Sequence, residues 1–347
     1  MLAGEAILNF SKNKTIRAEL FENTVIAGEN KLLLEEAGYL LERGRIALYD
    51  GGEELNLREF LKRASSLIPN FELRFLVYKN IRDRGYQLKA GILDFRVYPR
   101  GIKPGEGESK YIIRVLSERE PIDITTPGKD ILIARNLKKR LLYAVVDEEG
   151  DITYYEVKQK EMRGSLPPLG TDISAKGDLL EERVIIWDPF ILNKLNKSWW
   201  FGRLTDEGRR LQLSFVESAY LIEHGSIEVL DGDGNVLSLE RFIEVASAIE
   251  SNFYRKYIIY RDLRDKGMVV KTGFKFGSHF RVYEEMPSES VFHSRYLVHL
   301  LTDDHTARLP EISRAVRLAH GVKKEMVFAV VDESEAVQYV EIAWVRL

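Results

Sequence analysis

Cysteine is absent from this sequence of 347 residues, and all six histidines lie in its second half. The lack of cysteine excludes disulfides and cysteine-ligated metal centres. No apolar run is long enough to span a membrane, and the N-terminus lacks the pattern of a secretory signal, so we expect a cytoplasmic protein with no membrane partner. The formal net charge is −3, which indicates that any nucleic-acid site is a local patch and not a property of the whole surface.

The chain contains two copies of one unit. F-R-V-Y occurs at 95–98 and again at 280–283, an offset of 185 residues. The same offset relates K-K-R-L-L-Y-A-V-V-D-E at 138–148 to K-K-E-M-V-F-A-V-V-D-E at 323–333. Internal similarity at a fixed spacing predicts a tandem duplication, in which each copy folds in the same way.

Apolar residues recur with helix-like and strand-like spacing in alternation along both copies. The spacing predicts helices at 32–42 and 57–67. The sequence T-T-P-G-K predicts another helix, with Thr126 as its N-cap and Pro127 in its first position. Helices between strands favour an α/β or mixed α+β protein, with a front and a back α/β domain in each unit.

The expected domain boundaries follow from the repeat and from a cluster of Pro and Gly that is typical of a linker. In chain order they are 1–70 for the front domain of the first unit, 71–157 for its back domain, 158–183 for the linker, 184–252 for the front domain of the second unit and 253–347 for its back domain.

The second unit offers three side chains that can move protons or bind an anion. Tyr283 ends a predicted strand, His293 precedes an apolar strand, and Lys324 lies between a predicted helix and strand. Each residue type, taken alone, is more often an ordinary surface or packing side chain. The first unit keeps the matching tyrosine and lysine but has Glu108 where the second has His293. Without an imidazole it lacks the side chain that titrates near neutral pH, so we predict one active and one degenerate unit.

The second copy resembles a known family in three segments, which are F-R-V-Y (280–283), F-H-S-R-Y-L-V (292–298) and R-A-V-R-L-A-H-G-V-K-K-E-M-V-F-A (314–329). These motifs are similar to the catalytic domain of archaeal tRNA-splicing endonucleases (tRNA-intron lyases), in the two-unit form that works as a homodimer. The resemblance is specific over 257–333 and weaker over the front domains. It implies back domains of the restriction-endonuclease-like type and a precursor tRNA substrate cut at bulge–helix–bulge junctions.

The resemblance also implies roles for the three side chains. Tyr283 corresponds to the base, His293 to the acid and Lys324 to the stabiliser of charge on phosphorus, with Lys323 as a neighbouring candidate. In such a reaction the adjacent 2′-hydroxyl attacks, leaving a 2′,3′-cyclic phosphate and a 5′-hydroxyl, and no metal or other cofactor is expected. An ordinary tyrosine has a pKa of about 10, so we expect a nearby cation such as Lys324 to lower the pKa of Tyr283.

Two further family features have counterparts here. Two family arginines clamp a bulged base; one corresponds to Arg317, whereas Trp344 stands where the other is expected, and an indole can also stack on a base. The family docks an acidic loop into a basic cleft of the partner subunit, and the matching acidic residues of the second unit lie at 332–335. The corresponding interface residues of the first unit are Asp147, Glu148, Glu149 and Asp151.

Two alternatives remain open on the residues alone. A metal-dependent DNA nuclease of similar fold would need an acidic cluster near Asp262 and Asp265, but no E-x-K motif follows them. A non-catalytic RNA-binding or structural subunit would explain the degenerate first unit, but it would not explain the trio kept in the second.

Overall fold

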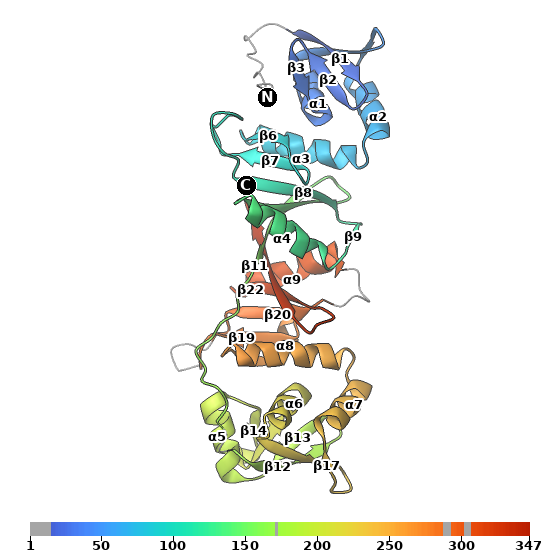
Figure 1. Cartoon of the computed structure of the whole chain (residues 1–347). Helices are drawn as coiled ribbons and strands as arrows, with labels where there is room; N and C mark the ends of the chain where they lie inside the picture. Colours follow the sequence, from blue (N-terminus) through green and yellow to red (C-terminus); the bar gives the residue numbers. More distant parts are fainter. Residues whose placement is uncertain (1–14, 171–172, 287–292, 302–306) are drawn as a thin grey trace.

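The computed structural model of the chain describes residues 15–170, 173–286, 293–301 and 307–347. The molecule is elongated: the two front domains lie at opposite ends and the two back domains meet in the middle (Figure 1). Strands and helices alternate through both units, which confirms the predicted mixed α/β class and the duplication. In the described part of the chain every helix is too short or too polar to cross a lipid bilayer.

The first unit begins with a five-stranded sheet in the order β3-β2-β1-β4-β5, in which β1 and β4 run parallel. Its elements, in chain order, are β1 (Ile16–Phe21), β2 (Thr24–Ala27), β3 (Asn30–Leu32), α1 (Leu34–Glu42), β4 (Ile46–Asp50), β5 (Glu53–Leu55), α2 (Leu57–Leu67), α3 (Phe71–Asp83), β6 (Gln87–Ala90), β7 (Phe95–Tyr98), β8 (Tyr111–Ser117), β9 (Pro121–Ile122), α4 (Thr126–Asn136), β10 (Arg140–Val146) and β11 (Ile152–Gln159).

The start of α4 differs from the prediction by one residue. The N-cap is Thr125 and not Thr126, so Pro127 occupies the second helical position. Asp123 explains the shift, because its carboxylate accepts hydrogen bonds from the backbone N–H and the hydroxyl of Thr125. This aspartate turn fixes the chain before the helix begins and leaves Thr126 inside the first turn.

The second unit repeats this order and adds helix α5, strand β14 and two short 3-10 helices, η1 and η2. Its elements are β12 (Ala175–Leu180), β13 (Arg183–Ile186), α5 (Pro189–Trp199), β14 (Arg203–Thr205), η1 (Asp206–Gly208), β15 (Arg210–Leu213), α6 (Phe215–Glu223), β16 (Ile227–Leu230), β17 (Val236–Leu237), α7 (Leu239–Ile249), α8 (Phe253–Asp265), β18 (Val269–Thr272), η2 (Phe274–Phe276), β19 (Phe280–Tyr283), β20 (Tyr296–Leu300), β21 (Ala307–Arg308), α9 (Leu309–Gly321), β22 (Glu325–Val331) and β23 (Val337–Val345).

The predicted linker is too long at its C-terminal end. Within 158–183, β12 joins the sheet of the second front domain, where it pairs in parallel with β16. The linker was predicted from the Pro and Gly cluster at 164–170. The alternating segment that follows this cluster is a strand, in which Ala175 and Gly177 are buried. The connecting segment therefore occupies 160–174.

The two back domains share one ten-stranded sheet in the order β18-β19-β20-β22-β23-β11-β10-β8-β7-β6. The order reads as the same five strands from each end, and the halves join where β11 and β23 pair antiparallel. A core cluster spans this seam and includes Ile112, Tyr155 and Val157 of the first unit with Met326 and Phe328 of the second. The duplicated units therefore form a single folded body.

Candidate active site

The three candidate side chains come from the ends of neighbouring strands in the second unit. Tyr283 is the last residue of β19 and is only 3% exposed. Its ring meets that of Trp200 edge to face, with the centroids 5.1 Å apart. His293 is exposed and comes shortly before β20. Lys324 directly precedes β22, which pairs in parallel with β20. Each residue therefore lies at the strand boundary that the sequence predicted.

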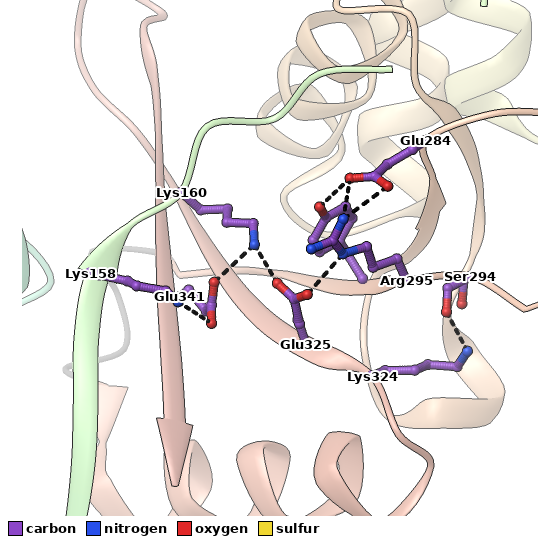
Figure 2. Close-up of polar contacts among 9 residues, drawn as sticks. Lys158, Lys160, Glu284, Ser294, Arg295, Lys324, Glu325 and Glu341 are labelled. Carbon is purple, nitrogen blue, oxygen red and sulfur yellow. Dashed lines mark hydrogen bonds and ion pairs between the residues drawn. The ribbon is translucent and has the colours of Figure 1, made fainter. Parts of the chain in front are cut away.

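Lys324 reaches the histidine segment because of the way α9 ends. The helix buries Ile312, Val316 and Ala319 at helical spacing, and the chain then turns at Lys323, whose φ is 56°. The Lys324 amide donates to the Ala319 carbonyl at 2.9 Å, and its Nζ donates to the Ser294 carbonyl at 2.6 Å (Figure 2).

Lys323 is exposed, whereas Lys324 is partly buried and bonded to the residue next to His293. This contact favours Lys324 over Lys323 as the member of the trio. The same left-handed turn occurs at Lys138 in the first unit, where φ is 54°. The turn is thus a property of the duplicated fold, and in each unit it sets the direction of the lysine that follows it, Lys324 or Lys139.

Burial raises the pKa of Tyr283, and the positive charge of Arg281 only partly opposes that effect. The prediction that Lys324 lowers this pKa is therefore wrong, since the phenol is more deeply packed than its strand-end position suggested. Burial, followed by repulsion from Arg281, lowers the pKa of Lys324. Arg281 thus lies within electrostatic reach of both Tyr283 and Lys324.

The matching positions of the first unit are arranged differently. Lys139 Nζ donates to Glu108 Oε2 at 2.7 Å, with the lysine side chain 15% exposed and the glutamate side chain 89% exposed. The hydrogen bond and charge of Lys139 hold the pKa of Glu108 below its ordinary value. The lysine that matches Lys324 is therefore paired with a carboxylate at the position that matches His293.

Arg317 and Trp344 lie at the seam between the units. Arg317 is exposed on α9 and lines a 340 Å³ cavity with Asp147 and Tyr155 of the first unit. Trp344 pairs with Tyr155 across the β11–β23 junction and is 38% exposed. His320, one turn beyond Arg317, approaches the Trp344 ring with centroids 5.7 Å apart. The two residues thus lie in one surface region that carries both aromatic and basic side chains.

The acidic loops of the two units are held differently. In the first unit, Asp147 Oδ1 accepts from the amides of Glu149 and Asp151, and Glu148 pairs with exposed Arg119 at 2.9 Å. Glu148, Glu149 and Asp151 are exposed.

In the second unit, Glu335 bonds to Tyr254 and pairs with Arg261 Nη2 at 2.8 Å. That loop is tied to its own α8. The loop of the first unit therefore presents more of its acidic side chains to solvent.

The two aspartates considered for a metal-dependent nuclease take part in structural contacts. Asp262 accepts from the hydroxyl of Tyr339 at 2.7 Å and pairs with Lys266 at 2.5 Å. Asp265 accepts from the hydroxyl of Tyr220 at 2.9 Å. These contacts tie α8 to β23 and to α6, which accounts for both carboxylates without a role in catalysis.

Sequence reasoning missed Arg281 and Trp200 as parts of the site. Arg281 has a local signal, since it precedes Tyr283 by two residues and side chains at that spacing share a face of a strand. Trp200 has none, because it comes from the front domain and reaches Tyr283 only through the packing of the two domains of the second unit.

Comparison with family models gives two matches. The model of the tRNA intron endonuclease catalytic C-terminal domain matches residues 71–154 and 253–339, so it finds both back domains. The model of the tRNA intron endonuclease N-terminal domain matches residues 175–243.

Curated relatives from archaea match nearly the whole chain. A tRNA-splicing endonuclease of Methanosarcina mazei is 44% identical over 318 residues, covering 91% of this chain and 90% of the relative. Those of Natronomonas pharaonis and Haloferax volcanii are each 36% identical, covering 89% of this chain and 87% of each relative.

Proposed function

Because this chain belongs to the tRNA intron endonuclease family, we propose that it cuts precursor tRNA at the bulge–helix–bulge junctions between intron and exons. Membership makes the chain an RNA endonuclease of the tRNA-splicing class. The proposal adds the shape of the substrate and the chemistry of the ends, which are a 2′,3′-cyclic phosphate and a 5′-hydroxyl.

The three residues of the second unit supply the groups that this reaction needs. Tyr283 takes the proton of the attacking 2′-hydroxyl, His293 gives a proton to the departing 5′-oxygen, and Lys324 stabilises the negative charge on the phosphorane. Burial keeps Tyr283 protonated at neutral pH, since it raises the pKa of the phenol. The reactive form is therefore a minor phenolate, which is a strong base once formed.

One observation carries the assignment: the difference between the two copies at one pair of positions. In the second unit the Lys324 ammonium donates to a backbone carbonyl beside His293, and it forms no ion pair with any residue that the structure describes. In the first unit Glu108 compensates the charge of Lys139. A phosphate approaching the first unit would meet a carboxylate, so only the second unit supports cleavage.

The surface at the β11–β23 junction, which carries Arg317 and Trp344, is suited to recognition of an RNA by its shape. The major groove of A-form RNA hides its base edges, so bulged bases that leave the stack are the readable elements. Trp344 offers a ring for stacking, and the Arg346 guanidinium already lies 5.0 Å from the centre of that ring. We assign Arg317 and Trp344 to base contacts, with Arg346 able to supply the charge that an arginine would bring in place of Trp344.

We further propose a homodimer in which the acidic loop of the first unit docks into a basic cleft of the partner subunit. A cleft of 840 Å³ between the front and back domains of the second unit is lined by six basic and three acidic side chains. The basic ones are Arg183, Arg203, Lys256, Lys271, Lys275 and Arg281. Charge complementarity between this cleft and the exposed loop supports that mode of assembly.

The role of His293 is tested with two substrates. His293→Ala should bind bulged RNA with nearly unchanged affinity, while single-turnover cleavage falls by roughly two to four orders of magnitude, as expected when a general acid is lost. RNA with sulfur as the 5′-leaving atom needs little protonation, so it should restore much of the rate of the variant. A variant that stays slow with the sulfur substrate, or that loses RNA binding, would contradict the acid role.

A further inference from the structure

A chain of ion pairs joins the residues that flank the three candidate catalytic side chains. Glu284 directly follows Tyr283, Arg295 comes two residues after His293, and Glu325 directly follows Lys324. Arg295 Nη1 lies 2.8 Å from Glu284 Oε1, and its Nε lies 2.8 Å from Glu325 Oε1 (Figure 2). One guanidinium therefore connects the strand end, the loop and the helix–strand turn that carry the trio.

Backbone hydrogen bonds reinforce the same three segments. The Arg295 amide donates to the Val282 carbonyl at 3.1 Å, and the Glu325 amide donates to the Arg295 carbonyl at 3.0 Å. Tyr296 adds a third contact, because its hydroxyl donates to Glu284 Oε1 at 2.6 Å. The guanidinium is planar and holds its two carboxylates at fixed angles, which limits sliding between the segments.

The chain of ion pairs continues into the first unit. Lys160, which directly follows β11, pairs with Glu325 and with buried Glu341, the latter at 3.0 Å. Lys158 at the end of β11 pairs with the other oxygen of Glu341 at 3.0 Å. In Figure 2 the green ribbon of the first unit carries Lys158 and Lys160 up to this network.

The connecting segment then runs along the back domain of the second unit as a strap, residues 160–166. The Ser165 amide donates to the Glu284 carbonyl at 2.8 Å, and the Gly164 amide donates to the Lys266 carbonyl at 2.8 Å. A Cβ on Gly164 would overlap the Gly267 carbonyl and lie 2.8 Å from the Glu284 carbonyl, so glycine is needed for this close approach. The strap therefore holds the residue next to Tyr283 by its backbone.

The degenerate unit lacks the network. At the 185-residue offset, Pro99, Lys110 and Arg140 stand where the second unit has Glu284, Arg295 and Glu325. Arg140 instead forms a local two-point ion pair with Glu156, with distances of 2.6 and 2.7 Å. The unit that lost the histidine has thus also lost the ionic link between its three segments.

We propose that Glu284, Arg295 and Glu325 are positioning residues that hold Tyr283, His293 and Lys324 in register for cleavage, with Lys160 and the strap anchoring them to the first unit. The inference rests on the roles proposed above for those three side chains. It also gives the degenerate unit a part in the reaction, as the supplier of the anchor.

Exposure indicates that these pairs act on geometry more than on stability. The Arg295 side chain is 51% exposed, and those of Glu284 and Glu325 are 41% and 31% exposed. Ion pairs this open to water add little to the free energy of unfolding. A misplacement of about 1 Å at a reacting centre, in contrast, slows a reaction by about 100-fold.

The test compares variants of the network with the matched ion pair of the first unit. Glu325→Gln and Arg295→Met should lower the single-turnover rate on bulge–helix–bulge RNA by about 10- to 100-fold, with little change in the RNA dissociation constant or in melting temperature. Arg295→Lys keeps a charge but lacks the fork, so it should recover part of the rate. Lys160→Met should give a smaller loss, and Glu156→Gln should behave as wild type.

The outcomes separate this inference from the proposed function. If Lys324→Ala still cleaves, the roles assigned to the trio are wrong. If Lys324→Ala is inactive but Glu325→Gln and Arg295→Met cleave at the wild-type rate, the positioning inference is wrong. A rate loss that is matched by weaker RNA binding or by a melting temperature lowered well below that of Glu156→Gln would also overturn it, because the network would then serve binding or stability.

Discussion

Replacing the two lysines at matching positions of the two units should affect cleavage differently. Lys324 and Lys139 follow the same left-handed turn and directly precede the corresponding strands, β22 and β10, in the two units. Lys324 donates to the Ser294 carbonyl, and its charge is uncompensated by that partner. Lys139 is neutralised by Glu108. We therefore expect Lys324→Ala to abolish most cleavage and Lys139→Ala to leave it unchanged.

The size of the effect follows from what each ammonium does. A donor that stabilises developing charge in a transition state typically contributes about 3–4 kcal/mol, or about 10²–10³ in rate. Lys324→Ala also leaves the carbonyl of buried Ser294 without its donor, which lowers the free energy of unfolding by about 1–3 kcal/mol. Lys139→Ala removes an ion pair whose glutamate side chain is 89% exposed, so the stability of this variant should change little.

The assay is single-turnover cleavage at saturating protein, with thermal melts of each variant. Lys324→Gln serves as a second variant, since it keeps a neutral N–H donor but no charge. It should stay as slow as Lys324→Ala while melting closer to wild type. Equal rate losses in Lys324→Ala and Lys139→Ala would refute the reasoning, because the first unit would then not be degenerate.

Three further predictions concern assembly, base catalysis and acid stability. The double variant Glu148→Lys and Glu149→Lys leaves the turn-forming Asp147 intact and should weaken the dimer in sedimentation velocity, most at low salt. The control is the single variant Glu333→Lys in the loop of the second unit. Unchanged sedimentation of the double variant would contradict the docking of the acidic loop. With His293→Ala and the sulfur substrate, the cleavage rate should rise about tenfold per pH unit between pH 7 and 9. Burial raises the pKa of Tyr283, so its phenolate fraction grows throughout this range. A cleavage rate that does not change with pH would exclude a tyrosine base. Burial, with repulsion from His299, lowers the pKa of His279 to about 3. At pH 5 the unfolded chain therefore binds a proton at this histidine that the folded chain does not bind. The free energy of unfolding should decrease as the pH falls below about 6.5, and should be about 2 kcal/mol lower at pH 5. His279→Asn keeps an acceptor for the Leu300 amide and should flatten this acid slope in melts; an unchanged slope would contradict the assignment.

Local patterns were sufficient to predict the duplication and helices such as α2, but not strand β12, which lies inside the predicted linker. Helix α2 occupies the predicted residues 57–67, and its start is fixed by a capping box between Asn56 and Glu59. The two F-R-V-Y motifs became the matching strands β7 and β19. The contrast between Glu108 and His293 was visible in the sequence, and the structure adds that Glu108 pairs with Lys139.

Contacts between distant segments could not be predicted in this way. The burial of Tyr283 depends on Trp200 from another domain, so its raised pKa has no local signal. The strap and Lys160 lie in a segment whose Pro and Gly content favoured a plain linker, yet that segment bonds to Glu284 and Glu325. Packing of this kind is decided by tertiary structure, which overrides local composition.

The measurement that tests the central claim most directly is the identity of the new RNA ends. Purified protein is incubated with a precursor tRNA that contains a bulge–helix–bulge intron, in the presence of EDTA, and the products are mapped. We predict excision of the intron at both junctions, with 2′,3′-cyclic phosphate and 5′-hydroxyl ends. Ends that carry a 3′-hydroxyl and a 5′-phosphate, or cleavage that EDTA abolishes, would contradict the proposed 2′-hydroxyl attack by Tyr283, His293 and Lys324.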